Sequence, residues 1–232
     1  MAVSSVKGFE PFALLTSRLI LIPTPIAVTV PSYRSLYAGL HADAAFCEMA
    51  FGPHFPARNW SDEETRQVIE SRDINRSWKN YGLGDFAVGL KPPSASIDDA
   101  SILRGHDFEA VAGPSGKLLG EIEWVGYAGV RDATTTSLPP READDPELPS
   151  WQEMVEIRYG ISSKHWGKAI AKEAADAVLH WAAKDRGVRR FIAETERENQ
   201  RSAGLLKKLG FSASGTNYWK EPSEVEWELA VQ

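Results

Sequence analysis

The sequence has 232 residues, of which 43% are hydrophobic and 25% charged, and its formal net charge is −6 at pH 7. These values are typical of a globular protein that can bury a sizeable core. The acidic balance speaks against nucleic acid as a partner, because binding to a phosphate backbone requires a surface rich in lysine and arginine. It is compatible with a cationic or amine ligand.

Cys47 is the only cysteine, which excludes an intrachain disulfide and favours an intracellular location. Its setting, AAFCEMAF, indicates a small core residue rather than a nucleophile. The five histidines show no metal-ligand spacing, so we expect no metal site. The apolar N-terminal stretch is interrupted by Arg18 and by prolines and fits neither a signal peptide nor a membrane span. We therefore expect a soluble, cytoplasmic protein.

The first part of the chain predicts a strand followed by helices. RLILIP (18–23) predicts a strand closed by Pro23 and Pro25, and helical material follows from Pro31 to about Met49. Ser61 and Glu64 form a capping box, which predicts a helix running toward Trp78. DFAVGLK (85–91) is predicted to be a further strand.

The middle of the chain contains two segments that we expect to be irregular insertions, at 92–106 and 127–150. Between them, residues 108–112 and 118–125 flank the turn sequence GPSGK, which is typical of a β-hairpin. The segment 127–150 is acidic and rich in proline, and loops of this length tend to be functional or mobile. A tolerated surface insertion is the alternative for this loop.

The second half is more regular. A strand is predicted at 154–162, a helix at 169–185 ended by Gly187, and a strand at 189–196. Asn199 is expected to begin another helix and Gly210 to end it. Two final strands are expected at 211–220 and 224–231, so residues 1–232 form one α+β domain with a mixed sheet.

The stretch EIRYGISSKHWGKAI (156–170) predicts a strand, a short loop containing glycine, and a helix. Neither the spacing of a P-loop nor that of a Rossmann loop is present, and Ala169 stands where a P-loop needs a hydroxyl. The free amides of a helix N-terminus favour phosphate or pyrophosphate. A plain strand-to-helix connection, eased by Gly167, is the alternative.

The segment KHWGKA (164–169) resembles the Arg/Gln-x-x-Gly-x-Gly/Ala pyrophosphate loop of the GNAT N-acetyltransferase superfamily. TSRLIL (16–21) looks like the opening of the branch that contains the ribosomal-protein-alanine N-acetyltransferases (RimJ/RimL-like). GEIEWV, EIRYGI and NQRS…KKLGF then follow in the order of that branch. The resemblance implies a central mixed sheet of about seven strands, splayed between its two central parallel strands, with about four flanking helices.

By the same resemblance, the cosubstrate is acetyl-coenzyme A. The backbone at Gly160 and Ile161 would hold the pantetheine arm, and the helix after the next strand would add contacts from Asn199 and Ser202. The expected pyrophosphate site consists of Lys164, His165, Trp166, Gly167, Lys168, Ala169 and Ile170. Asn199 also suits a helix N-cap.

Glu156 is the first candidate for the catalytic base, because glutamates at the equivalent position serve as base in some superfamily members. A carboxylate in a sheet interior would have a raised pKa, which suits a base near neutral pH. The alternative is a cross-strand ion pair, for instance with Arg158. Weaker candidates for the base are Glu121, Glu123, Glu194 and Glu196.

The proton donor for the leaving thiolate is not evident. Many superfamily members carry a tyrosine seven residues after the asparagine, where this chain has Leu206. Tyr159 and Tyr218 are available, although both suit packed rings. A backbone amide near Ile161 could polarise the thioester carbonyl.

Two functions are therefore expected. The first is an N-acetyltransferase that acetylates a protein N-terminus or a small-molecule amine in a ternary complex. The second is a non-catalytic module of the same fold that binds coenzyme A as a sensor or scaffold. The resemblance leaves a homodimer as an option for the assembly.

Overall fold

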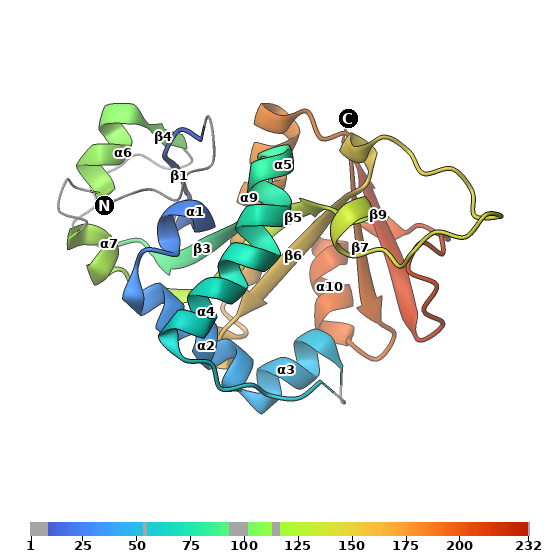
Figure 1. Ribbon diagram of the computed structural model, residues 1–232, viewed down its shortest axis with the longest axis horizontal. Helices are drawn as coiled ribbons and strands as arrows, with labels where there is room; N and C mark the ends of the chain where they lie inside the picture. The colour runs from blue at the N-terminus through green and yellow to red at the C-terminus, as the bar shows by residue number, and fades with distance from the viewer. Residues whose placement is uncertain (1–8, 53–54, 93–101, 113–116, 232) are drawn as a thin grey trace.

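The computed structural model describes residues 9–52, 55–92, 102–112 and 117–231. Within these residues the strands form one sheet of nine, in the order β4-β1-β2-β3-β5-β6-β7-β9-β8 (Figure 1). The strands are β1 (Phe12–Leu15), β2 (Leu19–Pro23), β3 (Asp85–Leu90), β4 (Ile102–Arg104), β5 (Trp124–Asp132), β6 (Val155–Ile161), β7 (Arg190–Glu196), β8 (Ser212–Ala213) and β9 (Glu224–Ala230).

Helices cover both faces of the sheet. The α-helices are α1 (Thr24–Ala27), α2 (Pro31–Ala42), α3 (Ala44–Phe51), α4 (Asp62–Ile69), α5 (Lys79–Tyr81), α6 (Gly105–Ala112), α7 (Lys117–Glu121), α8 (Ala133–Thr136), α9 (Ile170–Arg186) and α10 (Gln200–Lys208). A π-helix, η1 (Glu70–Trp78), continues α4, and η2 (Trp151–Glu153) and η3 (Ser163–His165) are 3-10 turns. In Figure 1, α4 and η1 pass in front of the sheet, whereas α9 lies behind it.

The sheet is splayed between β6 and β7, its one parallel pair among the described strands. These strands pair only at Val155 with Phe191 and at Glu156 with Ile192. By contrast, β6 pairs with β5 along its whole length, from Val155 to Ile161. The strands therefore separate after Glu156 and Ile192, and the later residues of β6 have a free edge. The predicted α+β class, mixed sheet and splay are confirmed.

The two faces of β6 look toward different helices, because side chains alternate along a strand. Tyr159 contacts Ser202 of α10 on one face. On the other face, a Cβ atom on Gly160 would lie 2.8 Å from Phe46 of α3. The face of β6 that carries Tyr159 thus contacts α10, and the opposite face adjoins α3.

Several local predictions are confirmed. Ser61 and Glu64 form the capping box at the start of α4, with Ser61 N bonded to the Glu64 carboxylate at 2.8 Å. Gly187 ends α9 in the left-handed conformation at φ 68°. The strand predicted at 154–162 is β6, and the helix predicted at 169–185 is α9.

The hairpin predicted around GPSGK is wrong. Residues 105–112 and 117–121 form the helices α6 and α7, and the strand begins only at Trp124. Leu119 and Ile122 are buried at a spacing of one helical turn. Most of the turn, residues 113–116, lies outside the described residues, as does 93–101 of the first expected insertion.

The second expected insertion, 127–150, is only partly irregular. Strand β5 continues through it to Asp132, and α8 follows. The Asp132 carboxylate caps α8 by accepting from the backbone N–H groups of Thr134 and Thr135 at 3.3 and 3.1 Å. The irregular part of the loop therefore begins after α8, at residue 137.

The expected strand at 211–220 is reduced to β8, Ser212–Ala213. Gly215 and Lys220 have left-handed φ values of 72° and 59°, which a strand does not accommodate. The Glu226 carboxylate instead accepts bonds from Thr216 Oγ1 at 2.5 Å and Trp219 N at 2.8 Å. Hydrogen bonds to a side chain, rather than a ladder of backbone hydrogen bonds, therefore hold Thr216 and Trp219 against β9. In the part of the chain that the structure describes, the sheet has nine strands where about seven were expected, and there are more than the expected four helices.

Candidate active site

The loop between β6 and α9 contains two left-handed residues directly before the helix. Gly167 has φ 76° and Ala169 has φ 59°. A Cβ atom placed on Gly167 would meet no atom within 4 Å, so the glycine faces open space. Ala169 is the N-cap of α9 and offers no side-chain cap to the helix.

The backbone amides at the start of α9 have no partners. Among the described residues, the N–H groups from Gly167 to Lys172 donate to no carbonyl and to no side chain. Free amides and the positive end of the helix dipole together favour an anion. The predicted strand, loop and helix are confirmed, and their geometry suits a phosphate group.

The lysines of the loop differ in their surroundings. Lys164 and Lys168 are exposed and make no described ion pair. Lys172 is paired with Asp176 one turn further along α9. Two lysine side chains thus remain available to an anion at this helix terminus.

Aromatic contacts brace the same loop. Trp166 Nε1 donates to the carbonyl of Ile161 at 2.7 Å, which ties the loop back to the end of β6. The guanidinium of Arg201 on α10 lies 5.0 Å from the centroid of the Trp166 ring. His165 Nε2 lies 3.5 Å from a carboxylate oxygen of Glu123. No motif in the sequence points to Arg201 as a neighbour of this loop.

The free edge of β6 presents particular backbone groups to the splay. Ser162 N donates to Val125 O at 2.9 Å, and bonding alternates along an antiparallel pair. Gly160 therefore directs its N–H and C=O toward β5, where they are used in the ladder. Tyr159 and Ile161 direct theirs toward β7. Of the two residues expected to offer backbone groups here, Ile161 is suitably oriented, and Tyr159 takes the place of Gly160.

Helix α10 contributes a cap and a hydroxyl. Asn199 Oδ1 accepts from Ser202 N at 3.0 Å, so the predicted N-cap is confirmed. Asn199 Nδ2 donates to the Met49 carbonyl at 2.8 Å, which leaves this amide group engaged at both atoms. Ser202 Oγ and Tyr159 Oη are hydrogen-bonded at 2.6 Å. This hydroxyl pair lies between α10 and the free edge of β6.

Leu206, which occupies the position where the resemblance would place a tyrosine, is part of the core. Leu206 is fully buried at 0% exposure, so its side chain serves in packing and offers no proton donor. Tyr218 accepts from Arg190 Nη2 at 3.1 Å and packs beside Trp219 in a separate small core cluster. Tyr159 is therefore the tyrosine that the structure places at the splay.

Glu156 faces the opposite side of the sheet and forms a two-point ion pair. Arg131 Nε and Nη2 donate to its two carboxylate oxygens at 2.9 and 3.0 Å. The alternative prediction for Glu156, a cross-strand ion pair, is thus confirmed. Its partner is Arg131. Arg158, the partner we expected, bonds Asp85 at 3.1 Å.

The expected rise in the pKa of Glu156 is wrong. Burial alone would raise the pKa, but the charge and hydrogen bonds of Arg131 outweigh it and hold the pKa below its ordinary value. Glu156 is consequently an ionised carboxylate near neutral pH. A role for Glu156 in catalysis stays a prediction.

Glu194, one of the weaker candidates, has the opposite electrostatic character. It lies two residues beyond Ile192, the last residue of β7 that pairs with β6, and on the same face as Ile192. Burial, a hydrogen bond with Glu224 and the charges of Glu224 and Glu156 raise the pKa of Glu194 to about 9. Two neighbouring carboxyl groups thus differ in protonation at neutral pH, a pattern often found where protons are transferred.

The remaining alternatives to Glu156 lie elsewhere. Glu121 and Glu123 are exposed, at the end of α7 and before β5. Glu196 is half-buried at the end of β7, where its carboxylate would lie 3.5 Å from a Cβ atom on Gly52. The structure does not bring these three carboxylates to Glu156.

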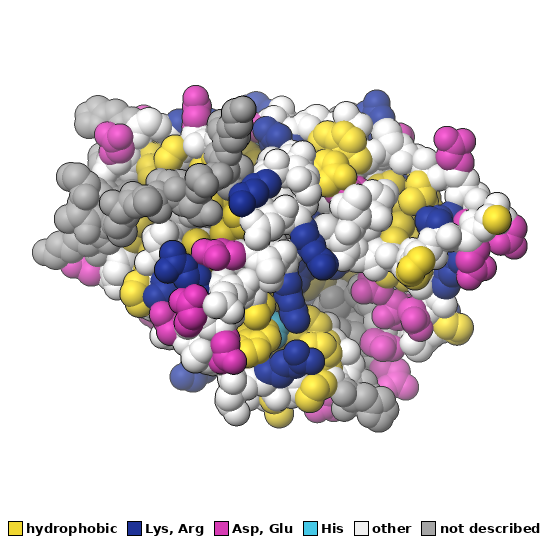
Figure 2. Space-filling model, viewed as in Figure 1, with side chains coloured by type: hydrophobic (Ala, Val, Ile, Leu, Met, Phe, Trp, Pro, Cys, Tyr) yellow, Lys and Arg dark blue, Asp and Glu magenta, His cyan; other side chains and the backbone are white. Residues whose placement is uncertain are grey.

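The face that carries Glu156 is hollowed. Figure 2 shows a depression between α4 with η1 on one side and β7 with α10 on the other. Lysine and arginine side chains gather on the first side, and acidic side chains gather on the second. This depression opens on the side of the splay opposite Tyr159 and Ser202.

Cys47 is a core residue, as predicted. Its side chain is buried at 0% exposure, and burial raises the pKa of its thiol. In the part of the chain that the structure describes, no cluster of acidic, histidine or cysteine side chains could hold a metal ion. None of the described helices is long and apolar enough to cross a membrane.

Sequence reasoning missed the side chains that control the candidate residues. Arg131 lies in the segment 127–150, which the sequence predicts to be an irregular loop, so the sequence does not reveal that Arg131 pairs with Glu156. Tyr159 suits a packed ring, although alternation along β6 places its side chain on the face of the sheet that Glu156 does not occupy. Recognising β5 as a longer strand would have revealed the first of these.

Residues 27–212, most of the chain, match the protein family described as the acetyltransferase (GNAT) domain. The chain belongs to the GNAT acetyltransferase family. The match includes β6, the loop before α9, and α10, so the candidate site lies inside the GNAT domain.

One curated relative is an uncharacterized N-acetyltransferase, p20, from Bacillus licheniformis. It is 35% identical over 60 residues, which is 26% of this GNAT chain and 34% of the relative. The chain thus spans about a third of the length of that relative.

Solved structures of acetyltransferases share the GNAT fold. An acetyltransferase from Agrobacterium tumefaciens strain C58 has a TM-score of 0.57 at 19% identity, covering 94% of both chains. RimL, a ribosomal L7/L12 α-N-protein acetyltransferase solved in complex with coenzyme A, has a TM-score of 0.57 at 14% identity, covering 94% of this chain and 96% of its own. At these identities the likeness concerns the fold alone.

Proposed function

We propose that the protein is an acetyl-coenzyme A-dependent N-acetyltransferase that acetylates a primary amine by direct attack in a ternary complex. The observation that carries this proposal is the uncapped N-terminus of α9, with free amides from Gly167 to Lys172 beside the free edge of β6. Membership of the GNAT family agrees with it. A cytoplasmic location is part of the same proposal.

The residues present fit coenzyme A. The loop from Lys164 to Ile170 would hold the pyrophosphate through its free amides, because an unbonded helix terminus favours an anion. The edge groups of Tyr159 and Ile161 would bond the pantetheine amides, and Ser202 lies beside them. Asn199 would act mainly by capping α10, since both atoms of its amide group are engaged.

When bound, acetyl-coenzyme A supplies an acetyl group as a reactive thioester. The chain's own contribution is orientation, which accounts for much of the rate in reactions of this kind. The N–H of Ile161, directed toward β7, is suited to polarise the thioester carbonyl. Tyr159, bonded to Ser202, is the hydroxyl best situated to protonate the leaving sulfur.

Glu156 is our candidate for the group that receives the proton of the acceptor amine. Held ionised by Arg131, it would attract an ammonium group and accept its proton, directly or through water. Glu194, held protonated nearby, would keep the local negative charge low. The acceptor would enter through the depression on this face.

The acceptor class within this proposal is a protein N-terminus or a small-molecule amine. The TSRLIL opening and the fold shared with RimL, which acts on a ribosomal protein, support the ribosomal-protein branch. The wall of acidic side chains along the depression suits a cationic acceptor.

Calorimetric titration with acetyl-coenzyme A, repeated on Gly167→Glu, tests the cofactor. We expect binding by the wild-type protein that the variant loses, because a carboxylate would then stand at the anion site. An assay of thiol release across a panel of amines and N-terminal peptides follows. Absence of binding by the wild-type protein would overturn the proposal.

A second candidate is a GNAT module that binds coenzyme A without catalysis. Two observations favour it: Leu206 is buried where many relatives have tyrosine, and Glu156 is held by Arg131. Binding of acetyl-coenzyme A without consumption of any amine in the panel would support this candidate. Turnover that Glu156→Gln lowers would exclude it.

A further inference from the structure

The turn between β1 and β2 contacts the first turn of α9 through a single carboxylate. Glu173 Oε1 accepts from Thr16 Oγ1 at 2.5 Å, Ser17 Oγ at 3.2 Å and Arg18 N at 3.0 Å. Glu173 Oε2 accepts from Arg18 Nε at 2.7 Å and Arg18 Nη2 at 2.6 Å. The TSR sequence, noted above only for its resemblance, thus supplies all the donors to one residue of α9.

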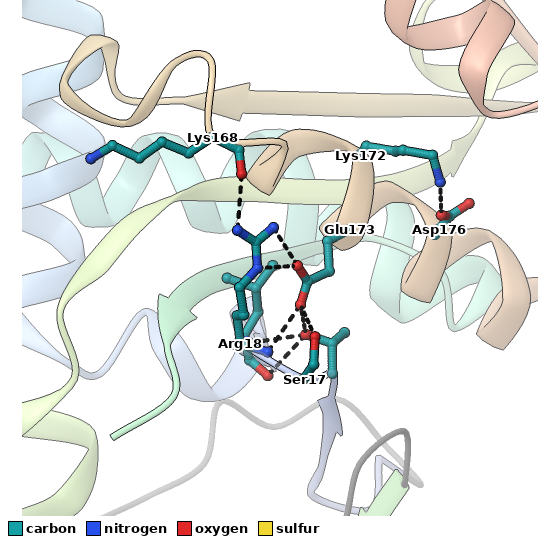
Figure 3. Close-up of polar contacts among 8 residues, drawn as sticks. Ser17, Arg18, Lys168, Lys172, Glu173 and Asp176 are labelled. Carbon is teal, nitrogen blue, oxygen red and sulfur yellow. Dashed lines mark hydrogen bonds and ion pairs between the residues drawn. The ribbon is translucent and has the colours of Figure 1, made fainter. Parts of the chain in front are cut away.

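The same guanidinium also bonds the loop itself. Arg18 Nη1 donates to the carbonyl oxygen of Lys168 at 3.0 Å, as Figure 3 shows. Within the described residues, no other side chain bonds a backbone atom of the exposed segment 167–169. Arg18 precedes Lys168 by 150 residues in the sequence and bonds both the loop carbonyl and the helix carboxylate.

This contact fixes the direction of a free amide. The Lys168 carbonyl and the Ala169 N–H belong to one planar trans peptide, so they point in opposite directions. Holding the carbonyl toward Arg18 turns the amide of Ala169 away from it, into the open space before α9. Ala169 is also left-handed at φ 59°, a conformation that a residue with a Cβ atom adopts only when its surroundings hold it.

Charge compensation gives Arg18 a second effect. Although burial opposes it, hydrogen bonds from Thr16 and Arg18 keep the pKa of Glu173 below its ordinary value, so Glu173 is ionised. An uncompensated carboxylate in the first turn of α9 would repel an anion bound at the helix terminus. The guanidinium of Arg18 neutralises it.

We propose that Arg18, acting with Glu173, is a positioning residue that holds the loop from Gly167 to Ala169 in the shape that binds the pyrophosphate of coenzyme A. This inference rests on the proposed function. Arg18 acts through the Lys168 carbonyl and touches no reacting atom.

The test compares a donor that carries the pyrophosphate with one that lacks it. Acetyl-coenzyme A and S-acetylpantetheine are each assayed with the wild-type protein, Arg18→Gln, Arg18→Lys and Glu173→Gln, and acetyl-coenzyme A binding is also measured by calorimetry. We expect Arg18→Gln to raise the Kd and KM for acetyl-coenzyme A about tenfold, because misplaced binding groups lose affinity steeply, with kcat changed less than about twofold. The kcat/KM for S-acetylpantetheine stays unchanged.

Arg18→Lys separates the two contacts. An ammonium group can pair with Glu173, but it lacks the planar fork that reaches Glu173 and the Lys168 carbonyl together. We therefore expect Arg18→Lys to retain the stability of the wild-type protein and to lose part of its affinity for acetyl-coenzyme A. If Arg18→Gln folds poorly, Arg18→Lys still allows the binding of acetyl-coenzyme A to be tested.

The matched control is Arg104→Gln. Arg104 pairs with Asp185 at 3.0 Å at the other end of α9, with side-chain exposures of 46% and 26%, close to the 49% and 17% of Arg18 and Glu173. The substitution Arg104→Gln therefore breaks a comparable ion pair on the same helix, at the end of α9 far from the loop. Its Kd for acetyl-coenzyme A should equal that of the wild-type protein.

The outcomes are distinct. If the wild-type protein binds no acetyl-coenzyme A, the proposed function fails. If it binds and Arg18→Gln binds equally well, the function stands and the inference about Arg18 is overturned. Equal losses with both donors, or an equal loss in Arg104→Gln, would also overturn it, because the ion pair would then only stabilise the fold.

Discussion

Glu156 and Arg131 stand directly opposite each other on β6 and β5, and both carboxylate oxygens accept from the guanidinium. The side chains are 8% and 20% exposed, so the pair is largely removed from water. A buried carboxylate is ordinarily expected to hold its proton. Here the fixed guanidinium reverses that expectation, and the candidate catalytic group is an anion whose charge is balanced within the protein.

Glu156→Gln should impair both stability and turnover. Arg131 would be left without its counter-charge, so the free energy of unfolding should fall by about 3 kcal/mol. If Glu156 receives the amine proton, kcat should fall roughly 100-fold with little change in the KM for acetyl-coenzyme A. Urea unfolding and steady-state kinetics measure the two effects separately.

The double variant Glu156→Leu with Arg131→Met is the control for this prediction. It removes both charges together, so it should regain much of the stability that the single variant loses. It should not regain turnover. Full activity in Glu156→Gln, measured well below its unfolding temperature, would remove Glu156 from the mechanism.

Glu194 should make the free energy of unfolding fall as the pH rises, which is the opposite of the usual effect of a carboxylate. Its ordinary pKa is 4.5 and its pKa in the folded protein is about 9, so between these values the folded protein holds a proton that the unfolded chain has released. The contribution of Glu194 to the free energy of unfolding is complete below pH 4.5 and declines as the pH rises toward 9. Glu194→Gln should remove that decline.

The measurement is urea unfolding of the wild-type protein and Glu194→Gln across this pH range. Glu156 provides the opposite slope, since its pKa is lowered and its contribution is lost only as the pH falls below its ordinary value of 4.5. A difference between the two proteins that stays constant with pH would show that Glu194 titrates normally.

Local signals sufficed to predict the strand, the loop and the helices that carry the proposed cofactor residues. The alternation in β6, Gly167 in the loop, Asn199 as N-cap and Gly187 as C-cap all act within one turn or one strand, so the sequence alone specifies them. Residues 105–121 could not be assigned correctly, because short apolar runs beside a glycine-rich turn suit a hairpin and a helix pair equally.

The electrostatics of the site could not be predicted from local signals. Arg131 reaches Glu156 only through the register of two antiparallel strands, and Arg18 reaches Glu173 across 155 residues. Both contacts depend on tertiary packing. The first contact determines the direction of the pKa shift of Glu156, and the second ties down the loop that we propose binds the pyrophosphate.

Cys47 should be inert toward thiol reagents in the native protein. Its thiol is buried, contacts the carbonyl of His41 at 3.3 Å and has a raised pKa because of its burial. A chromogenic disulfide reagent should label it only in denaturant, with one thiol per chain as the control value. Rapid labelling of the native protein would mean that α3 opens readily.

The two left-handed residues that bound α9 should respond in opposite directions to exchange of glycine and alanine. Ala169 has φ 59° and Gly187 has φ 68°, and neither position is crowded, since a Cβ on Gly187 would meet nothing within 4 Å. Gly187→Ala should lower the free energy of unfolding by about 1 kcal/mol, because a Cβ atom is strained in this conformation.

Ala169→Gly should instead raise the free energy of unfolding by about 0.5 kcal/mol, since relief of strain exceeds the added freedom of the unfolded chain. Urea denaturation of both variants at one pH measures the pair, and each serves as the control for the other. If both variants were destabilised, the loop would not hold Ala169 in the left-handed region. The amide of Ala169 would then lack the direction on which the proposed binding of pyrophosphate at α9 depends.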